Sequence, residues 1–146
     1  MKTCVHYLNL PKIPDELEKL AVDVLSQNEN MNLNELDNYK WTEASKTELS
    51  KWCYHNISPS LYWGVQVMSG DLGWHWDEPT TVKITYIFQT GGNNVETVFY
   101  DTLCKTVLQS IIIEPKRWHI LNVKEIHAVR GIQPGKLRIS LTGRIF

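Results

Sequence analysis

The sequence predicts a mainly β, α+β domain in which helices near the N-terminus cover one sheet of an antiparallel β-sandwich or barrel. The length of 146 residues suits one domain with its own core. Amphipathic helical patterns occupy the first third of the chain, and short β-rich runs separated by turn signals follow from Leu61 onward. We therefore expect residues 1–146 to form a single domain, with residues 1–60 as a helical support and residues 61–146 as the β core.

The two predicted helices are both amphipathic. The first begins at Pro14 and Asp15, because proline is accepted in the first turn and acidic side chains are stabilised there by the helix dipole. The second begins at a capping-box sequence, residues 45–48, and the polar residues 26–38 before it indicate a loop. Their apolar stripes consist of Leu17, Leu20, Ala21, Val24, Leu25, Leu49, Trp52 and Cys53. These stripes need an apolar partner, which a sheet provides.

The β-rich runs each end at a turn that contains Gly, Pro or Asn. They are residues 61–68, 81–89, 96–100, 106–113, 118–122 and 136–145. In the last run, Leu137, Ile139 and Leu141 share an apolar face, which we expect to lie under the helices. Alternation then points Arg138 and Ser140 into the space between the sheets.

Composition excludes several classes of function. Lys and Arg number 15 and Asp and Glu number 16, so the net charge is -1 and no broad basic field can hold a nucleic acid. No apolar run approaches the ~18 residues of a membrane span, and the N-terminus lacks the apolar core of a secretory signal. The 3 cysteines are too widely spaced for a disulfide framework or a structural zinc site. We expect a cytoplasmic protein that binds neither nucleic acid nor membrane.

A histidine and an aspartate two positions apart form the first part of a candidate metal site. On an extended segment, alternate residues project to the same side, so His75 and Asp77 can reach one metal ion together. His127 follows just before the run that carries Arg138, and is a candidate third ligand. His119, which also lies in a β-rich run, is the alternative third ligand.

Arg138 is the second candidate site residue. A guanidinium between two sheets needs an anion, because an unpaired buried charge is very costly. Arginine grips a carboxylate with two parallel hydrogen bonds, and Ser140 could donate to the same carboxylate.

The order and spacing of these residues resemble the non-haem Fe(II)- and 2-oxoglutarate-dependent dioxygenases, most closely the prolyl-hydroxylase branch. The residues that carry the resemblance are His75, Asp77, His127, Arg138 and Ser140. Residues 86–99, with a Gly-Gly turn and the sequence Glu-Thr-Val-Phe, resemble the family's strand–turn–strand segment. The likeness extends over residues 61–146, and its spacing favours His127 over His119 as the third ligand.

The resemblance implies a double-stranded β-helix, which is a jelly-roll or cupin-like fold. It also implies that His75, Asp77 and His127 are the catalytic centre and hold Fe(II), which such a ligand set leaves with open positions. The implied cosubstrates are 2-oxoglutarate and O2, and ascorbate is a further candidate cofactor.

The resemblance assigns the 2-oxoglutarate tail to Arg138, assisted by Ser140. The prolyl-hydroxylase branch usually has a tyrosine that contacts this cosubstrate on the strand entering the site, and Gln66 occupies that region here. Tyr86 is a second candidate for the contact.

The implied function is hydroxylation of an unactivated C–H bond, with a peptidyl residue such as proline as one substrate. A peptide, a protein or a small molecule therefore remains the expected partner. Two alternatives stay open: a non-catalytic cupin-like module that binds a metal or a small acid, and the same chemistry on a nucleobase or free metabolite. The near-neutral charge argues against a nucleic acid substrate.

Overall fold

The computed structural model describes most of the chain. The described residues are 4–26, 39–43, 48–77, 82–101, 103 and 106–145. The helices are α1 (Asp15–Ser26) and α2 (Glu48–Asn56). The strands are β1 (Val5–Tyr7), β2 (Tyr39–Glu43), β3 (Tyr62–Met68), β4 (Leu72–His75), β5 (Val82–Thr90), β6 (Glu96–Tyr100), β7 (Val107–Ile111), β8 (His119–Leu121), β9 (Ile126–Arg130) and β10 (Arg138–Ile145). Most of the predicted loop and capping box lies outside the described residues. Neither helix is long and apolar enough to cross a membrane.

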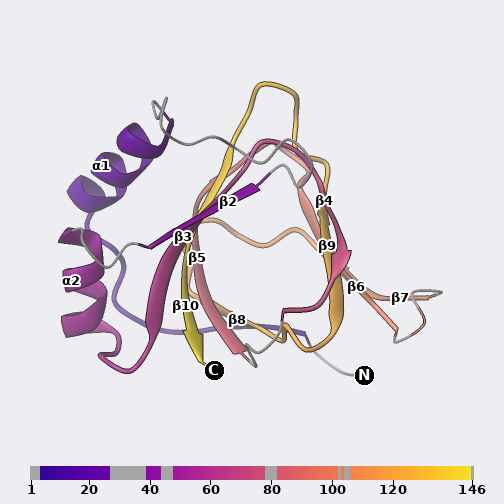
Figure 1. The fold of residues 1–146 in the computed structure, drawn as a ribbon, viewed down its shortest axis with the longest axis horizontal. Helices are drawn as coiled ribbons and strands as arrows, with labels where there is room; N and C mark the ends of the chain where they lie inside the picture. Colours follow the sequence, from indigo (N-terminus) through magenta and orange to yellow (C-terminus); the bar gives the residue numbers. More distant parts are fainter. Residues whose placement is uncertain are drawn as a thin grey trace.

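The strands form two antiparallel sheets that face each other. One sheet has six strands in the order β1-β8-β5-β10-β3-β2, and the other has four in the order β4-β9-β6-β7. Figure 1 shows both helices on the outer side of the six-stranded sheet, with the four-stranded sheet across its inner side. This jelly-roll arrangement, a double-stranded β-helix, confirms the predicted fold class.

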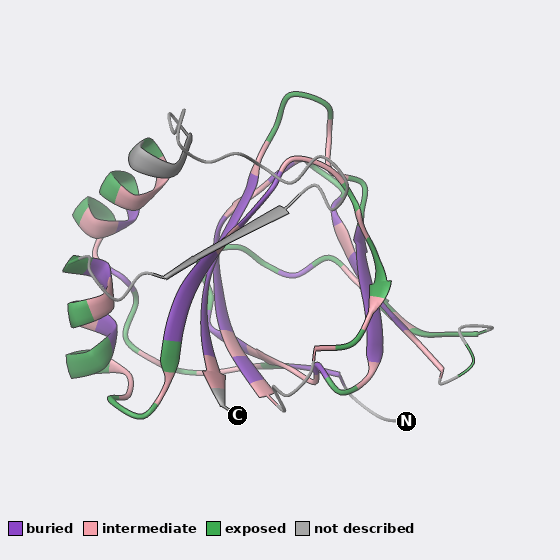
Figure 2. Ribbon diagram, viewed as in Figure 1, coloured by how far each residue is buried: buried purple, intermediate pink, exposed green. Residues whose placement is uncertain are grey.

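The main core lies between the helices and the six-stranded sheet (Figure 2). Ile139 and Leu141 are both 0% exposed and belong to one apolar cluster with Ile13, Leu49 and Cys53. The predicted apolar face of the last strand is therefore confirmed. Because side chains alternate along a strand, the same placement turns Arg138 and Ser140 toward the other sheet.

The buried face of α1 differs from the predicted stripe. Leu20 is 54% exposed, so its assignment to the buried stripe is wrong. Leu17, Ala21 and Val22 pack against the core instead. Glu18 is also buried on this face, and its carboxylate pairs with the Lys116 ammonium at 3.1 Å.

The region before residue 60 is not purely helical, which corrects the predicted helical support. β1 pairs with β8 and β2 pairs with β3, so these two strands extend the six-stranded sheet at both edges. Edge strands this short gain their order from a neighbour rather than from a hydrophobic pattern of their own. Their sequences therefore carried no strand signal that could be separated from a loop.

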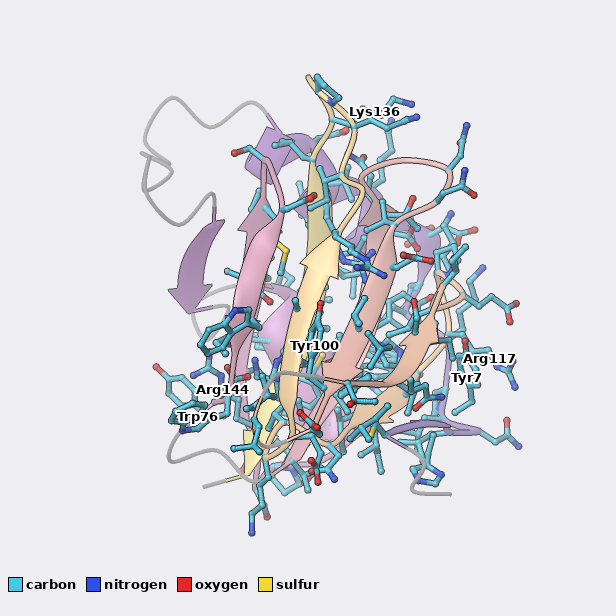
Figure 3. The ribbon with its side chains drawn as sticks, turned by 90° about the vertical axis from the view of Figure 1, so that its right-hand side faces the viewer. Tyr7, Trp76, Tyr100, Arg117, Lys136 and Arg144 are labelled. Atoms are coloured by element: carbon cyan, nitrogen blue, oxygen red, sulfur yellow. The ribbon has the colours of Figure 1, made fainter. Side chains whose placement is uncertain are left out.

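The three tryptophans near the start of the β core have different environments. Trp63 is buried in the main core beside Trp118, with ring centroids 5.9 Å apart. Trp74 and Trp76, on either side of His75, are 59% and 51% exposed. Figure 3 shows Trp76 at the surface, near the end of the sheet where Arg144 lies. The two exposed rings therefore contribute little to the core.

Shortening Ile139 should destabilise the whole domain. We expect Ile139→Ala to lower the free energy of unfolding by about 2–5 kcal/mol, because it leaves a cavity in a fully buried site. Leu20→Ala removes an apolar side chain from an exposed site and should change that free energy by less than ~0.5 kcal/mol. Urea unfolding of both variants measures the difference. Equal losses would show that the apolar face of β10 is not the core beneath the helices.

Candidate metal centre and its pocket

Three potential metal ligands meet where β4 lies beside β9. β4 and β9 are antiparallel neighbours, and their register places His75 opposite His127. Asp77 follows β4, where its backbone N–H donates to the Val123 carbonyl at 3.2 Å. One ligand atom from each of His75, Asp77 and His127 lies within 4.8 Å of the others. The structure thus brings together the three residues that the sequence nominated.

Both imidazoles of this cluster direct Nε2 toward Asp77. The Nε2 atoms of His75 and His127 lie 3.3 Å and 3.9 Å from the Asp77 carboxylate oxygens. The other ring nitrogen, Nδ1, is 2.7 Å from the Gly73 carbonyl in His75 and 2.8 Å from the Glu125 carbonyl in His127. A carbonyl oxygen can only accept, so Nδ1 carries a hydrogen in each ring. In the neutral rings Nε2 is then the atom available to a metal.

The protonation states of the cluster also suit a cation. Burial lowers the pKa of His127 to about 4, so this ring is neutral at pH 7. Burial alone would raise the pKa of Asp77, but the hydrogen bond from His75 and the charge of Lys83 hold it below its usual range. Burial would lower the pKa of His75, yet its hydrogen bonds to Asp77 and Gly73 leave that pKa raised. A metal would therefore compete with a proton mainly at His75.

Lys83 is the residue of this centre that sequence reasoning missed. It is 7% exposed, and its ammonium pairs with the Asp77 carboxylate. Burial lowers the pKa of Lys83, and the charge of Asp77 partly opposes this effect. Alternation along β5 was the available signal, because Lys83 shares a face with Thr85 and Ile87, which also line the pocket.

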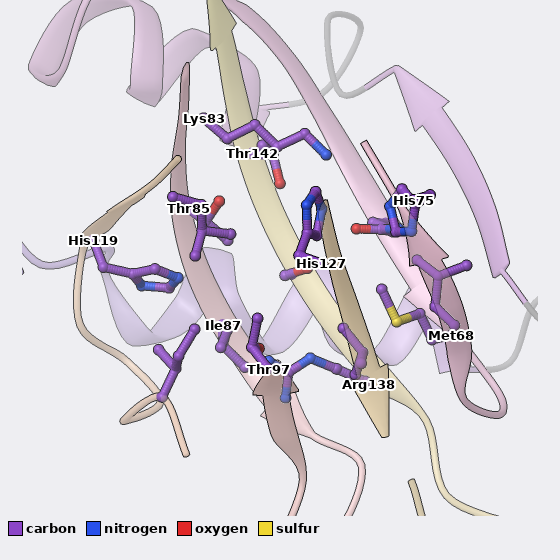
Figure 4. A pocket seen from close by; sticks show the side chains of 16 residues that line it. Met68, His75, Lys83, Thr85, Ile87, Thr97, His119, His127, Arg138 and Thr142 are labelled. Atoms are coloured by element: carbon purple, nitrogen blue, oxygen red, sulfur yellow. The ribbon is translucent and has the colours of Figure 1, made fainter. Parts of the chain in front are cut away.

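The cluster opens into a pocket between the two sheets (Figure 4). Among its lining residues are His75, His127, Gln66, Arg138 and Ser140, so the predicted inward orientation of the last two is correct. The remaining space has a volume of about 50 Å³, room for only a few water molecules. A larger ligand would need flexible lining side chains to move.

Arg138 enters this pocket without an acidic partner. It is 5% exposed, and its guanidinium donates to the Thr90 carbonyl at 3.2 Å. In the described part of the chain no carboxylate lies within salt-bridge distance of it. Burial lowers the pKa of Arg138 to about 10, so it is still charged at pH 7. A buried cation in this state is a strong site for an anion.

The turn after β5 packs closely against the start of β10. Gly91 has a φ of 86°, and a Cβ at that position would lie 3.2 Å from both the Cβ and the backbone nitrogen of Arg138. The left-handed backbone and the close approach both favour glycine. The Gly-Gly turn seen in the sequence therefore helps to fix the position of Arg138.

Tyr86 lies on the wrong face of β5 for the role considered from the sequence. It is 0% exposed and packs against Trp118 and Phe88 in the core beneath the helices, with ring centroids 5.0 Å and 5.5 Å away. Its neighbours Thr85 and Ile87 line the pocket, and strand alternation turns Tyr86 to the opposite side. The prediction that Tyr86 contacts a ligand in the pocket is therefore wrong.

His119, the alternative third ligand, does not join the cluster. It lies on β8 in the six-stranded sheet and lines the pocket from there. The group of potential metal ligands found in the described residues contains His127 and not His119.

Comparison of the sequence with family models and with curated proteins finds no match. Solved structures do match. A prolyl hydroxylase from Trichoplax adhaerens, in complex with a hypoxia inducible factor peptide fragment, has a TM-score of 0.63 at 13% identity, over 97% of this chain and 83% of that chain. A prolyl-4-hydroxylase from Pseudomonas putida has a TM-score of 0.55 at 12% identity, over 97% and 91%. The alpha ketoglutarate dependent epimerase SnoN from nogalamycin biosynthesis has a TM-score of 0.62 at 9% identity, over 94% and 76%.

At these identities the likeness shows the fold and not the activity. The three enzymes include hydroxylases and an epimerase, so one architecture carries more than one reaction. This chain has the same double-stranded β-helix fold as these three enzymes.

Proposed function

We propose that the protein is an Fe(II)- and 2-oxoglutarate-dependent oxygenase. One observation carries the proposal: a cluster of His75, Asp77 and His127 shares a pocket with the unpaired, buried Arg138. The cluster has the two-histidine, one-carboxylate composition of non-haem Fe(II) sites. A metal chelator that also carries a distant carboxylate satisfies both features, and 2-oxoglutarate has that chemistry. The fold shared with enzymes of this type gives independent support.

In this proposal His75, Asp77 and His127 hold the metal through the two Nε2 atoms and the carboxylate. Bound Fe(II) with 2-oxoglutarate would supply the activation of O2 that oxidises a substrate C–H bond. The protein's own part is to position the ligands. The Gly73 and Glu125 carbonyls fix the histidine rings, and the pocket walls exclude bulk water.

The opposite sheet would hold the far carboxylate of 2-oxoglutarate. Arg138 would grip it, and Ser140 would donate a hydroxyl hydrogen bond. Gln66 lies opposite Ser140 in the register of β3 and β10 and also lines the pocket, so it is a second polar group for the same ligand. Because the pocket is small, entry of the cosubstrate would require the flexible side chains of Met68 and Lys83 to shift.

We propose hydroxylation of a peptidyl residue, such as proline, as the reaction. The support is the fold shared with two prolyl hydroxylases, one of them in complex with a peptide.

The proposed function has a direct spectroscopic and chemical test. Anaerobic addition of Fe(II) and 2-oxoglutarate should give the weak visible charge-transfer band of a chelate, because both would bind one centre. With O2, succinate release should then rise on addition of the true substrate, which a screen of peptides and free metabolites can identify. The absence of the band and of succinate would reject an oxygenase. Metal binding alone would instead support a cupin-like binding module.

The histidine cluster can be tested by one substitution and its control. We expect His127→Ala to abolish turnover and to weaken metal binding, because it removes a buried ligand while leaving the core intact. His55→Ala, at an exposed position on α2, should leave both unchanged. Calorimetric metal titration and succinate release provide the two measurements. Normal metal binding by His127→Ala would remove His127 from the site.

Arg138→Ala should raise the 2-oxoglutarate requirement steeply while leaving metal binding nearly intact. Loss of one partner of a buried ion pair costs about 3–5 kcal/mol, or roughly a few hundred- to a few thousand-fold in affinity. Arg138→Lys should lose less, because it keeps the charge without the planar fork. Arg130→Ala is the control, since Arg130 is half-exposed and pairs with Glu96 on the surface. Calorimetry that finds equal 2-oxoglutarate affinity for Arg138→Ala and the unchanged protein would refute the anchor.

A further inference from the structure

His119 is a buried titratable group that the proposed chemistry does not yet use. It is 0% exposed, and its ring points into the pocket from β8 (Figure 4). In the sheet register it lies between Tyr7 of β1 and Thr85 of β5. Its position is therefore fixed by strands on both sides, while its free ring edge faces the cavity.

The hydrogen bonding of the ring defines what that edge can do. Nδ1 lies 3.1 Å from the Arg117 carbonyl, which can only accept, so Nδ1 carries the hydrogen. Nε2 is then a bare acceptor in the neutral ring. It is buried and has no hydrogen-bond partner among the described residues. A buried acceptor without a partner is costly, so this atom favours a hydrogen-bond donor or a proton.

The groups that face His119 are cationic or neutral. From β10, Arg138 acts on it directly through its positive charge, and from β5 Lys83 lines the same pocket. His127 faces it from the other sheet as a second histidine. From β1, the Tyr7 ring lies 6.2 Å away, with the Arg117 guanidinium 4.0 Å above that ring (Figure 3). None of the described lining residues is an acid.

These surroundings keep the imidazole neutral in the free protein. Burial is the largest cause, and the positive charge of Arg138 adds to it, so that the pKa of His119 is lowered to about 4. A carboxylate that enters beside Arg138 reverses the second effect. It offsets the cation and offers an acceptor to a protonated Nε2, and both changes favour the imidazolium.

We propose that His119 takes up one proton when the far carboxylate of 2-oxoglutarate binds, so that its imidazolium and the Arg138 guanidinium hold that carboxylate together. This inference rests on the proposed function. The proton comes from solvent and goes to Nε2, and apart from coordination of the ligand to the metal no other bond forms or breaks. Arg138 supplies a permanent charge, whereas His119 supplies a charge only when the ligand is present.

Proton uptake makes the affinity depend on pH. Ligand binding coupled to uptake of one proton weakens by up to ~tenfold for each pH unit of increase. His119→Gln keeps an amide that can donate to a carboxylate but cannot take up a proton. This variant should therefore bind 2-oxoglutarate without that pH dependence. His6→Gln, at an exposed position on β1, is the matched control.

The test is calorimetric titration of 2-oxoglutarate into the Zn(II)-loaded protein near pH 7, in phosphate and in Tris buffers. These buffers differ in ionisation enthalpy, so the difference between the binding enthalpies measured in the two buffers gives the number of protons taken up. We expect net uptake approaching one proton for the unchanged protein and for His6→Gln, and clearly less for His119→Gln. Binding without proton uptake by the unchanged protein overturns the inference and leaves the proposed function standing. No binding of 2-oxoglutarate to the unchanged protein overturns both.

The nuclear magnetic resonance signal of the His119 ring gives a second readout that needs no variant. In the Zn(II)-loaded protein its chemical shift should report a neutral ring at pH 7 and a charged ring after 2-oxoglutarate is added. A ring that stays neutral with ligand bound would contradict the inference, even if His119→Gln fails to fold.

Discussion

The unpaired positive charge of Arg138 is the constraint on which the rest of the structure depends. Arg138 begins β10, one of the two middle strands of the six-stranded sheet, and Ile139 and Leu141 on the other face of that strand are fully buried beneath the helices. Side chains alternate along a strand, so if Ile139 and Leu141 point into the core, the Arg138 guanidinium must face the other sheet. Within the described residues no acid neutralises it there, so folding leaves a buried site for an anion. The core and the binding site are thus two faces of one strand.

The two sheets contribute different chemistry to the space between them. The four-stranded sheet, through β4 and β9, brings His75 and His127 together beside Asp77, and fixes both rings through backbone carbonyls. The six-stranded sheet contributes the unpaired cation Arg138, whereas its other cation, Lys83, reaches the metal cluster and pairs with Asp77. A ligand that spans the pocket must therefore offer metal-binding atoms at one end and a negative charge at the other. Because the metal ligands and the unpaired cation lie on different sheets, the pocket favours a chelating dicarboxylate over a simple monoanion.

The sequence was most informative where one local rule decides a side chain's direction. Alternation along the last strand oriented Arg138 correctly, and the spacing of the His-x-Asp motif found two members of the metal cluster. The same rule applied to β5 would have turned Tyr86 away from the pocket and Lys83 into it, but the register of that strand could not be chosen without its neighbours. The unpartnered Nε2 of His119 could not be predicted from the sequence either. The hydrogen-bond partner of the other ring nitrogen is a backbone carbonyl, and the surroundings of the ring come from four strands far apart in the sequence. Side-chain direction was predictable, whereas tertiary neighbours were not.

A crystal structure of the protein with Fe(II) and 2-oxoglutarate, grown without oxygen, tests the central claim most directly. Anomalous scattering at the iron edge locates the metal independently of the protein model. The account predicts one iron bound by Nε2 of His75, Nε2 of His127 and the Asp77 carboxylate, with the far carboxylate of 2-oxoglutarate on Arg138. Iron bound elsewhere, or 2-oxoglutarate bound with Arg138 still lacking an anion, would contradict the account.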